Sequence, residues 1–104
     1  MGKKQEISKL TNLLCKSLRH KIGSIVNPNE FYAGKYARDA EVLLREAEKV
    51  VITHNWNSQD KKTIKDQLTK KLRKELEEKT FINEQKFDLM DGEIKKVLEE
   101  LKLI

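Results

Sequence analysis

Apolar residues recur at spacings of three and four in four separate stretches of this chain. That spacing is typical of helices that bury one side, whereas a strand would alternate apolar and polar residues at every second position. The first stretch covers about 4–26, with apolar residues Ile7, Leu10, Leu14, Leu18, Ile22 and Ile25. The others cover about 29–53, 58–79 and 84–103. The pattern therefore predicts four helices.

The breaks between these stretches contain residues that end helices. The only proline lies in the run NPN at 27–29, and the run THNWNSQ covers 53–59. A weaker break, TFIN, covers 80–83. Short connections favour antiparallel neighbours, so we expect an all-α fold, a compact four-helix bundle with antiparallel up-down order. At 104 residues the chain has the size of one domain, so we expect 1–104 to form a single helical domain.

The second predicted helix has the broadest apolar side. Its stripe through Tyr36, Leu43 and Val50 is widened by Leu44 and Val51. A helix that is apolar over a wide arc is contacted from more than one side. We therefore expect the second helix to be the central one.

Polar residues that accept hydrogen bonds from free backbone amides mark helix starts. Asn57 or Ser58 is suited to begin the third helix. The start of the fourth stays open, because Asn83 or Asp88 suits a cap and Asp91 suits a restart.

Charge is distributed unevenly over these stretches. The chain has 22 basic and 17 acidic residues, a net charge of +5. Residues 1–26 carry six basic residues and one acid, and residues 57–80 carry eight and five, whereas the other two stretches are net acidic. Two interpretations stay open. Sequential helices carry complementary charge, or the basic helices bind an anionic partner.

Two basic surfaces are the candidate sites for nucleic acid or another anion. Basic side chains repeat on the side of the first helix opposite its apolar stripe, and the third helix contains the block KKLRK at 70–74. Such repeats suit a phosphate backbone, and arginine adds a bidentate fork. The candidates are Lys9, Lys16 and Arg19 on the first helix and Lys70, Lys71, Arg73 and Lys74 on the third. In an antiparallel bundle these helices can lie diagonally, so whether the surfaces merge stays open.

Trp56 is the candidate residue for protein interaction, because an exposed tryptophan is a frequent binding hot spot. The alternative is a tryptophan that closes the end of the bundle. Nearby His54 lacks an assignable catalytic partner in the sequence. Cys15 lies at the edge of the first apolar stripe, so we expect it in the core.

Composition argues against several classes of protein. One cysteine rules out an intrachain disulfide framework, and two histidines with one cysteine are too few for a Cys/His zinc site. We expect no metal and no cofactor. No run approaches the roughly 18 apolar residues of a membrane span, so we expect no membrane contact and a cytoplasmic location. The basic, amphipathic N-terminal stretch is also typical of a transit peptide, which remains an alternative.

No nucleophile, acid–base pair or phosphate loop can be assembled from these residues, so we expect that the protein is not an enzyme. The sequence favours a small helical interaction module that serves as an accessory subunit of a larger assembly. Whether that assembly contains nucleic acid stays open. A protein partner or self-association is expected. The alternative is a stand-alone nucleic-acid-binding protein that uses the basic faces of the first and third helices.

Overall fold

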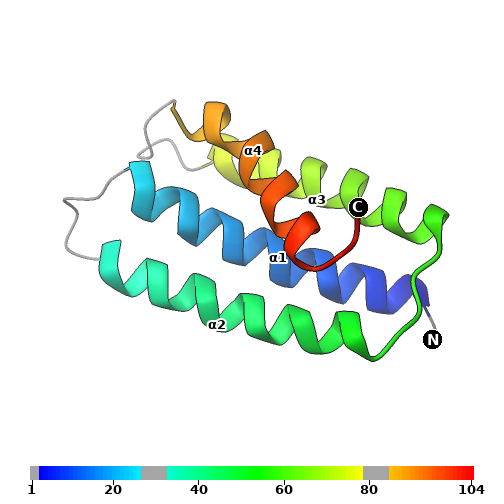
Figure 1. The fold of residues 1–104 in the computed structure, drawn as a ribbon. Coiled ribbons are helices and arrows are strands. Elements are labelled where there is room, and N and C mark those ends of the chain that lie inside the picture. Colours follow the sequence, from blue (N-terminus) through cyan, green and yellow to red (C-terminus); the bar gives the residue numbers. More distant parts are fainter. Residues whose placement is uncertain (1–2, 27–32, 79–84) are drawn as a thin grey trace.

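The computed structural model describes residues 3–26, 33–78 and 85–104, which fold into four α-helices with no strand in those ranges (Figure 1). The helices are α1 (Lys3–Val26), α2 (Ala33–Ile52), α3 (Ser58–Glu78) and α4 (Gln85–Glu100). The predicted all-α four-helix bundle is therefore confirmed. The candidate cap Asn83 lies outside the described residues.

Helix α1 is the centre of the bundle. It packs against α2, α3 and α4, whereas α2 contacts only α1 among the described helices. The expectation that the second helix is central is therefore wrong. The apolar arc of α2 is wide because apolar side chains lie on both edges of its contact with a single neighbour, α1. Only Ala40, Ala47 and Val50 of α2 are buried, and the bulkier Leu43 and Leu44 on either side remain half-exposed.

Helix direction alternates along the chain in Figure 1, with α1 and α3 running one way and α2 and α4 the other. The ion pairs agree for α1 and α3, since Lys3 pairs with Asp60 and Arg19 pairs with Glu75. In a square up-down bundle these two helices would be diagonal, but here they pack directly against each other. The segment that connects α2 to α3 therefore crosses the N-terminal end of α1 (Figure 1).

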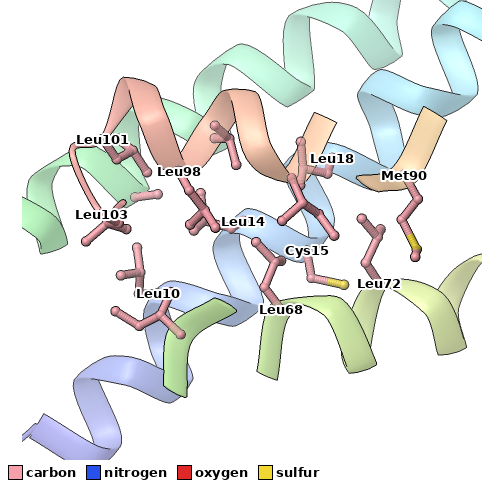
Figure 2. Close-up of a cluster of buried hydrophobic side chains, with 14 of the residues drawn as sticks. Leu10, Leu14, Cys15, Leu18, Leu68, Leu72, Met90, Leu98, Leu101 and Leu103 are labelled. Atoms are coloured by element: carbon pink, nitrogen blue, oxygen red, sulfur yellow. The ribbon is translucent and has the colours of Figure 1, made fainter. Parts of the chain in front are cut away.

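Large apolar side chains from α1, α3 and α4 fill the core (Figure 2). At most 2% of each of the following is exposed: Leu10, Leu14, Leu18, Leu68, Leu72, Met90 and Leu98. Burying a side chain of this size contributes about 1.5–3 kcal/mol relative to leaving it in water. All four helices therefore contribute to one apolar interior, but α2 supplies only the smaller Ala47 and Val50 to it.

Helix α2 approaches α1 closely through small side chains. Ala40 and Ala47 are buried and lie seven residues apart, so they occupy the same side of the helix. The buried Ser17 of α1 donates a 2.7 Å hydrogen bond from Oγ to the carbonyl oxygen of Ala40. The hydroxyl of Ser17 is thereby satisfied inside the α1–α2 contact, which stabilises it.

The start of α3 resolves one open alternative, because Asn57 is its cap. Asn57 Oδ1 accepts a 2.8 Å hydrogen bond from the Asp60 amide, and Asp60 Oδ2 accepts a 3.1 Å bond from the Asn57 amide. This reciprocal pair is a capping box. In α4, the helix continues through Asp91 and Gly92, so Asp91 does not restart it.

The predicted end of the fourth helix near 103 is wrong, because α4 ends at Glu100. Lys102 adopts the left-handed conformation with φ 58°, which breaks the helix. The Lys102 amide donates to the Glu99 carbonyl at 3.1 Å and the Leu103 amide donates to the Leu98 carbonyl at 2.8 Å. These two bonds form a Schellman motif. The motif turns Leu103 back into the core, where only 1% of it is exposed (Figure 2).

The central position of α1 predicts unequal costs for two leucine truncations. Leu14→Ala in α1 removes a fully buried side chain, and we expect it to lower the free energy of unfolding by about 2–5 kcal/mol. Leu43→Ala in α2 removes a half-exposed side chain, so its cost should be less than half as large. Urea unfolding followed by circular dichroism measures both values. Equal costs would contradict the central position of α1.

Candidate functional site

The two predicted basic surfaces meet in a groove between α1 and α3. The groove has a volume of about 350 Å³ and is lined by Asn12, Cys15, Lys16, Lys71, Lys74, Glu75 and Glu78. It exists because α1 and α3 pack directly and run in the same direction. Three of the seven predicted anion-binding residues, Lys16, Lys71 and Lys74, therefore come together there.

The other four predicted residues lie outside this groove. Lys9 is exposed on α1, seven residues before Lys16 and hence on the same ridge. Arg19 is half-buried, and its Nη1 donates to Glu75 Oε2 at 3.1 Å. Lys70 and Arg73 are exposed on α3 but do not line the groove. A rotation of 100° per residue directs Arg73 away from α1.

The three groove lysines differ in their surroundings. Lys71 Nζ donates to Thr11 Oγ1 at 2.8 Å and to Asn12 Oδ1 at 2.9 Å, which fixes its position. Lys16 and Lys74 make no hydrogen bond or ion pair with any residue in the described ranges. Their ammonium groups are therefore the cations that remain available to a ligand.

The acidic residues of the groove limit its positive charge. Glu75 is engaged by Arg19, whereas Glu78 is exposed near the end of α3. With Arg19 offsetting Glu75, the lysines outnumber the remaining acid. The groove thus carries charges of both signs, three lysines and two glutamates.

Cys15 forms part of the groove wall but is only 5% exposed. Burial, followed by the nearby charge of Glu75, raises the pKa of the Cys15 thiol to about 11. The thiol is therefore protonated at neutral pH and is a poor nucleophile. The prediction that Cys15 is a core residue is confirmed.

Trp56 is half-buried and packs against the core. Its Nε1 donates a 2.9 Å hydrogen bond to the Val51 carbonyl, and Lys3 Nζ lies 5.7 Å from the centre of its ring. These contacts correspond to the alternative in which Trp56 closes the end of the bundle. The ring of His54 lies beside it, with 5.6 Å between ring centres. A role for Trp56 in binding a protein stays a prediction.

Charge complementarity between helices exists, but it does not join α1 to α2 in the part of the chain described here. Lys3 and Arg19 of α1 pair with α3, and Lys21 of α1 pairs with Glu93 of α4. The basic charge of α1 is therefore matched partly by α3, the other basic helix. Net charge per helix missed this, because the pairing depends on individual residues at the contact.

Glu93 is a buried charge that the sequence reasoning missed. Lys21 Nζ lies 2.7 Å from its Oε1 and Lys96 Nζ lies 3.3 Å from its Oε2. The pair with Lys21 depends on charge rather than on an aligned hydrogen bond, since Oε1 lacks a well-directed donor. Burial acts to raise the pKa of Glu93, but the two ammonium groups outweigh it and hold the pKa below its ordinary value. The sequence contained one signal of this burial: Glu93 is an acid three residues after Met90, within the apolar stripe of α4.

Comparison with known proteins does not identify this arrangement. No protein-family model, no curated protein and no solved structure matches the chain. Over the described ranges, no three His, Cys, Asp or Glu side chains gather where they could hold a metal ion. None of the four described helices is both long and apolar enough to cross a membrane.

Proposed function

We propose that this chain is a non-enzymatic interaction module, an accessory subunit of a larger assembly, and that its partner docks along α2. The observation that carries the proposal is that α2 packs on α1 alone. No other described helix packs on the rest of its surface, which includes Val42 and Ile52, 56% and 81% exposed. Exposed apolar side chains along a helix face that no other described helix covers are a feature of interaction surfaces.

The apolar character of α2 continues around its sides. Leu43 and Leu44 are half-exposed and lie on opposite edges of the contact with α1. Val42 and Ile52 lie further round, toward solvent. A partner seated on α2 would therefore cover apolar surface without displacing any side chain from the core.

The side chains most often used in catalysis are engaged structurally, which supports a non-enzymatic role. The Cys15 thiol is buried and protonated. The His20 ring packs edge-on against the Tyr36 ring, with 5.3 Å between ring centres. Burial, followed by the charge of Arg19, lowers the pKa of His20. His54 Nδ1 lies 2.8 Å from the hydroxyl of Thr53.

We expect the double substitution Val42→Lys and Ile52→Lys to abolish association while leaving the fold intact. Both side chains are exposed, so the free energy of unfolding should change by no more than about 0.5 kcal/mol per site. Light scattering after size-exclusion chromatography measures the molar mass over a range of concentrations. Copurification from native extract tests for a different partner.

The matched control is Ile25→Lys with Ile104→Lys, because both isoleucines are exposed but lie outside α2. That control should associate as the wild-type chain does. The proposal is wrong if the wild-type chain neither self-associates nor copurifies with a partner. It is also wrong if the substitutions in α2 and the control have equal effects.

The groove between α1 and α3 favours nucleic-acid binding as a second candidate function. Lys16 and Lys74 are without partners in the described ranges, and Lys71 is held by its hydrogen bonds to Thr11 and Asn12. The described residues that line the groove include no aromatic side chain, so none of them offers the base stacking used by single-strand binders. We therefore propose contact with the phosphate backbone, without preference for base sequence.

The groove predicts that Lys16→Glu with Lys74→Glu weakens binding to a labelled single-stranded oligonucleotide. Two lost phosphate contacts should reduce the slope of log affinity against log salt by about 1.4. Fluorescence anisotropy at several salt concentrations gives this slope. Lys62→Glu with Arg73→Glu is the charge-matched control, because both residues are exposed on α3 and neither lines the groove. Equal losses in the two variants would contradict the assignment to the groove.

A further inference from the structure

The solvent-facing side of α2 carries six residues at alternating spacings of four and three: Gly34, Arg38, Glu41, Arg45, Glu48 and Ile52. All six are exposed. Residues at these spacings share one side of a helix and correspond to the seam positions of a coiled coil. This set of six residues is referred to below as the α2 seam.

The α2 seam is complementary to its own reverse. When a second α2 is turned end to end about Leu43, Arg38 faces Glu48 and Glu41 faces Arg45. The remaining position brings Ile52 opposite Gly34. We propose that the α2 seam binds the α2 seam of a second copy of this chain. The two helices run antiparallel, and the two-fold axis between them is level with residue 43 along each helix. Such a self-complementary contact closes into a dimer. The inference rests on the proposed function, because it names the occupant of the same α2 surface.

The charged residues of the seam are available for this contact. Arg38, Glu41, Arg45 and Glu48 make no ion pair or hydrogen bond with any residue that the structure describes. In the antiparallel dimer each of the two opposite-charge pairs forms twice by symmetry. Pairs at seam positions lose part of their hydration on contact, which offsets much of their attraction, and salt screens the rest. The dimer is therefore of modest affinity and weakens as salt is added.

The ends of the seam supply apolar burial. Ile52 is the most exposed of the large apolar side chains in the described ranges. Among the described residues, a methyl group added at Gly34 would meet the tip of Arg38, 3.9 Å away, and no other atom within 4 Å. The backbone at Gly34 is therefore accessible, and an isoleucine from the second copy can pack on it. This contact also forms twice.

The two-fold axis brings further apolar side chains together at the centre. Val42 and Leu44 flank the seam on opposite sides, and each lies one residue from the axis. Rotation about the axis sets Val42 beside its own copy on one edge and Leu44 beside its own copy on the other. A helix from an unrelated partner would not require the reverse order of charges along α2. Self-complementarity thus favours a second copy as the occupant.

Charge reversal tests this pairing directly. Arg38→Glu alone and Glu48→Arg alone each place like charges opposite one another, and each should weaken dimerisation at least about tenfold at about 50 mM salt. The double variant restores opposite charges and should return the dimer dissociation constant to within about threefold of wild type. Sedimentation equilibrium measures these constants, and circular dichroism confirms that the exposed substitutions leave the helices formed.

The design contains its own controls. The two single substitutions change net charge in opposite directions, so a general charge effect cannot weaken both. Residues 38 and 48 are ten positions apart on one helix and do not contact each other within a chain. Recovery in the double variant therefore reports a contact between chains. Lys62→Glu on α3 should leave the dimer unchanged.

Three results would overturn the inference: a wild-type chain that stays monomeric at millimolar concentration, single variants that still dimerise, or a double variant that does not recover. A monomeric chain that copurifies with a different protein, and loses it on Val42→Lys with Ile52→Lys, would contradict this inference alone. A monomer that copurifies with nothing would contradict the proposed function as well.

Discussion

The burial of α1 on three sides is the constraint on which the rest of the structure depends. Its buried positions extend over more than half of the helix circumference and comprise Ile7, Leu10, Thr11, Leu14, Cys15, Ser17, Leu18, Ile22 and Gly23. Polar residues are admitted to this interior where they are bonded. The Ser17 hydroxyl donates to α2, and the Thr11 hydroxyl accepts from Lys71 of α3. The packing of each other helix on α1 then decides which surfaces remain exposed.

Both candidate surfaces follow from this arrangement. Because α3 packs on α1 in the same direction, Lys16 of one helix and Lys74 of the other border a common groove. Because α2 packs on α1 through the small Ala40 and Ala47, it lies close to α1 and away from α3 and α4. Its outer side, with Val42 and Ile52, then has no cover within the described chain.

The number, class and approximate bounds of the helices could be predicted, because apolar periodicity and the breaks between stretches are local signals. The position of each helix in the bundle could not. The broad apolar arc of α2 suggested a central helix, but an arc records how much surface is apolar and not how many neighbours cover it. The end of α4 was also missed, since Lys102 is not the glycine that usually marks a left-handed helix end.

The candidate site was predicted in part for the same reason. The basic residues of α1 and α3 were identified by type and spacing, yet only Lys16, Lys71 and Lys74 line the groove. The burial of Glu93 and its pairing with Lys21 depend on contacts between helices far apart in sequence. The α2 seam has a readable spacing, but its exposure became evident only when α2 was found to pack on one helix.

Native-state hydrogen exchange tests the central position of α1 most directly. If α2 is held by α1 alone, the amides of Ala40, Ala47 and Val50 should exchange through an opening that leaves α1, α3 and α4 protected. The amides of Leu14 and Leu18 should then exchange only on global unfolding. Equal opening free energies for the α2 and α1 amides, under conditions where the chain is monomeric, would contradict this account.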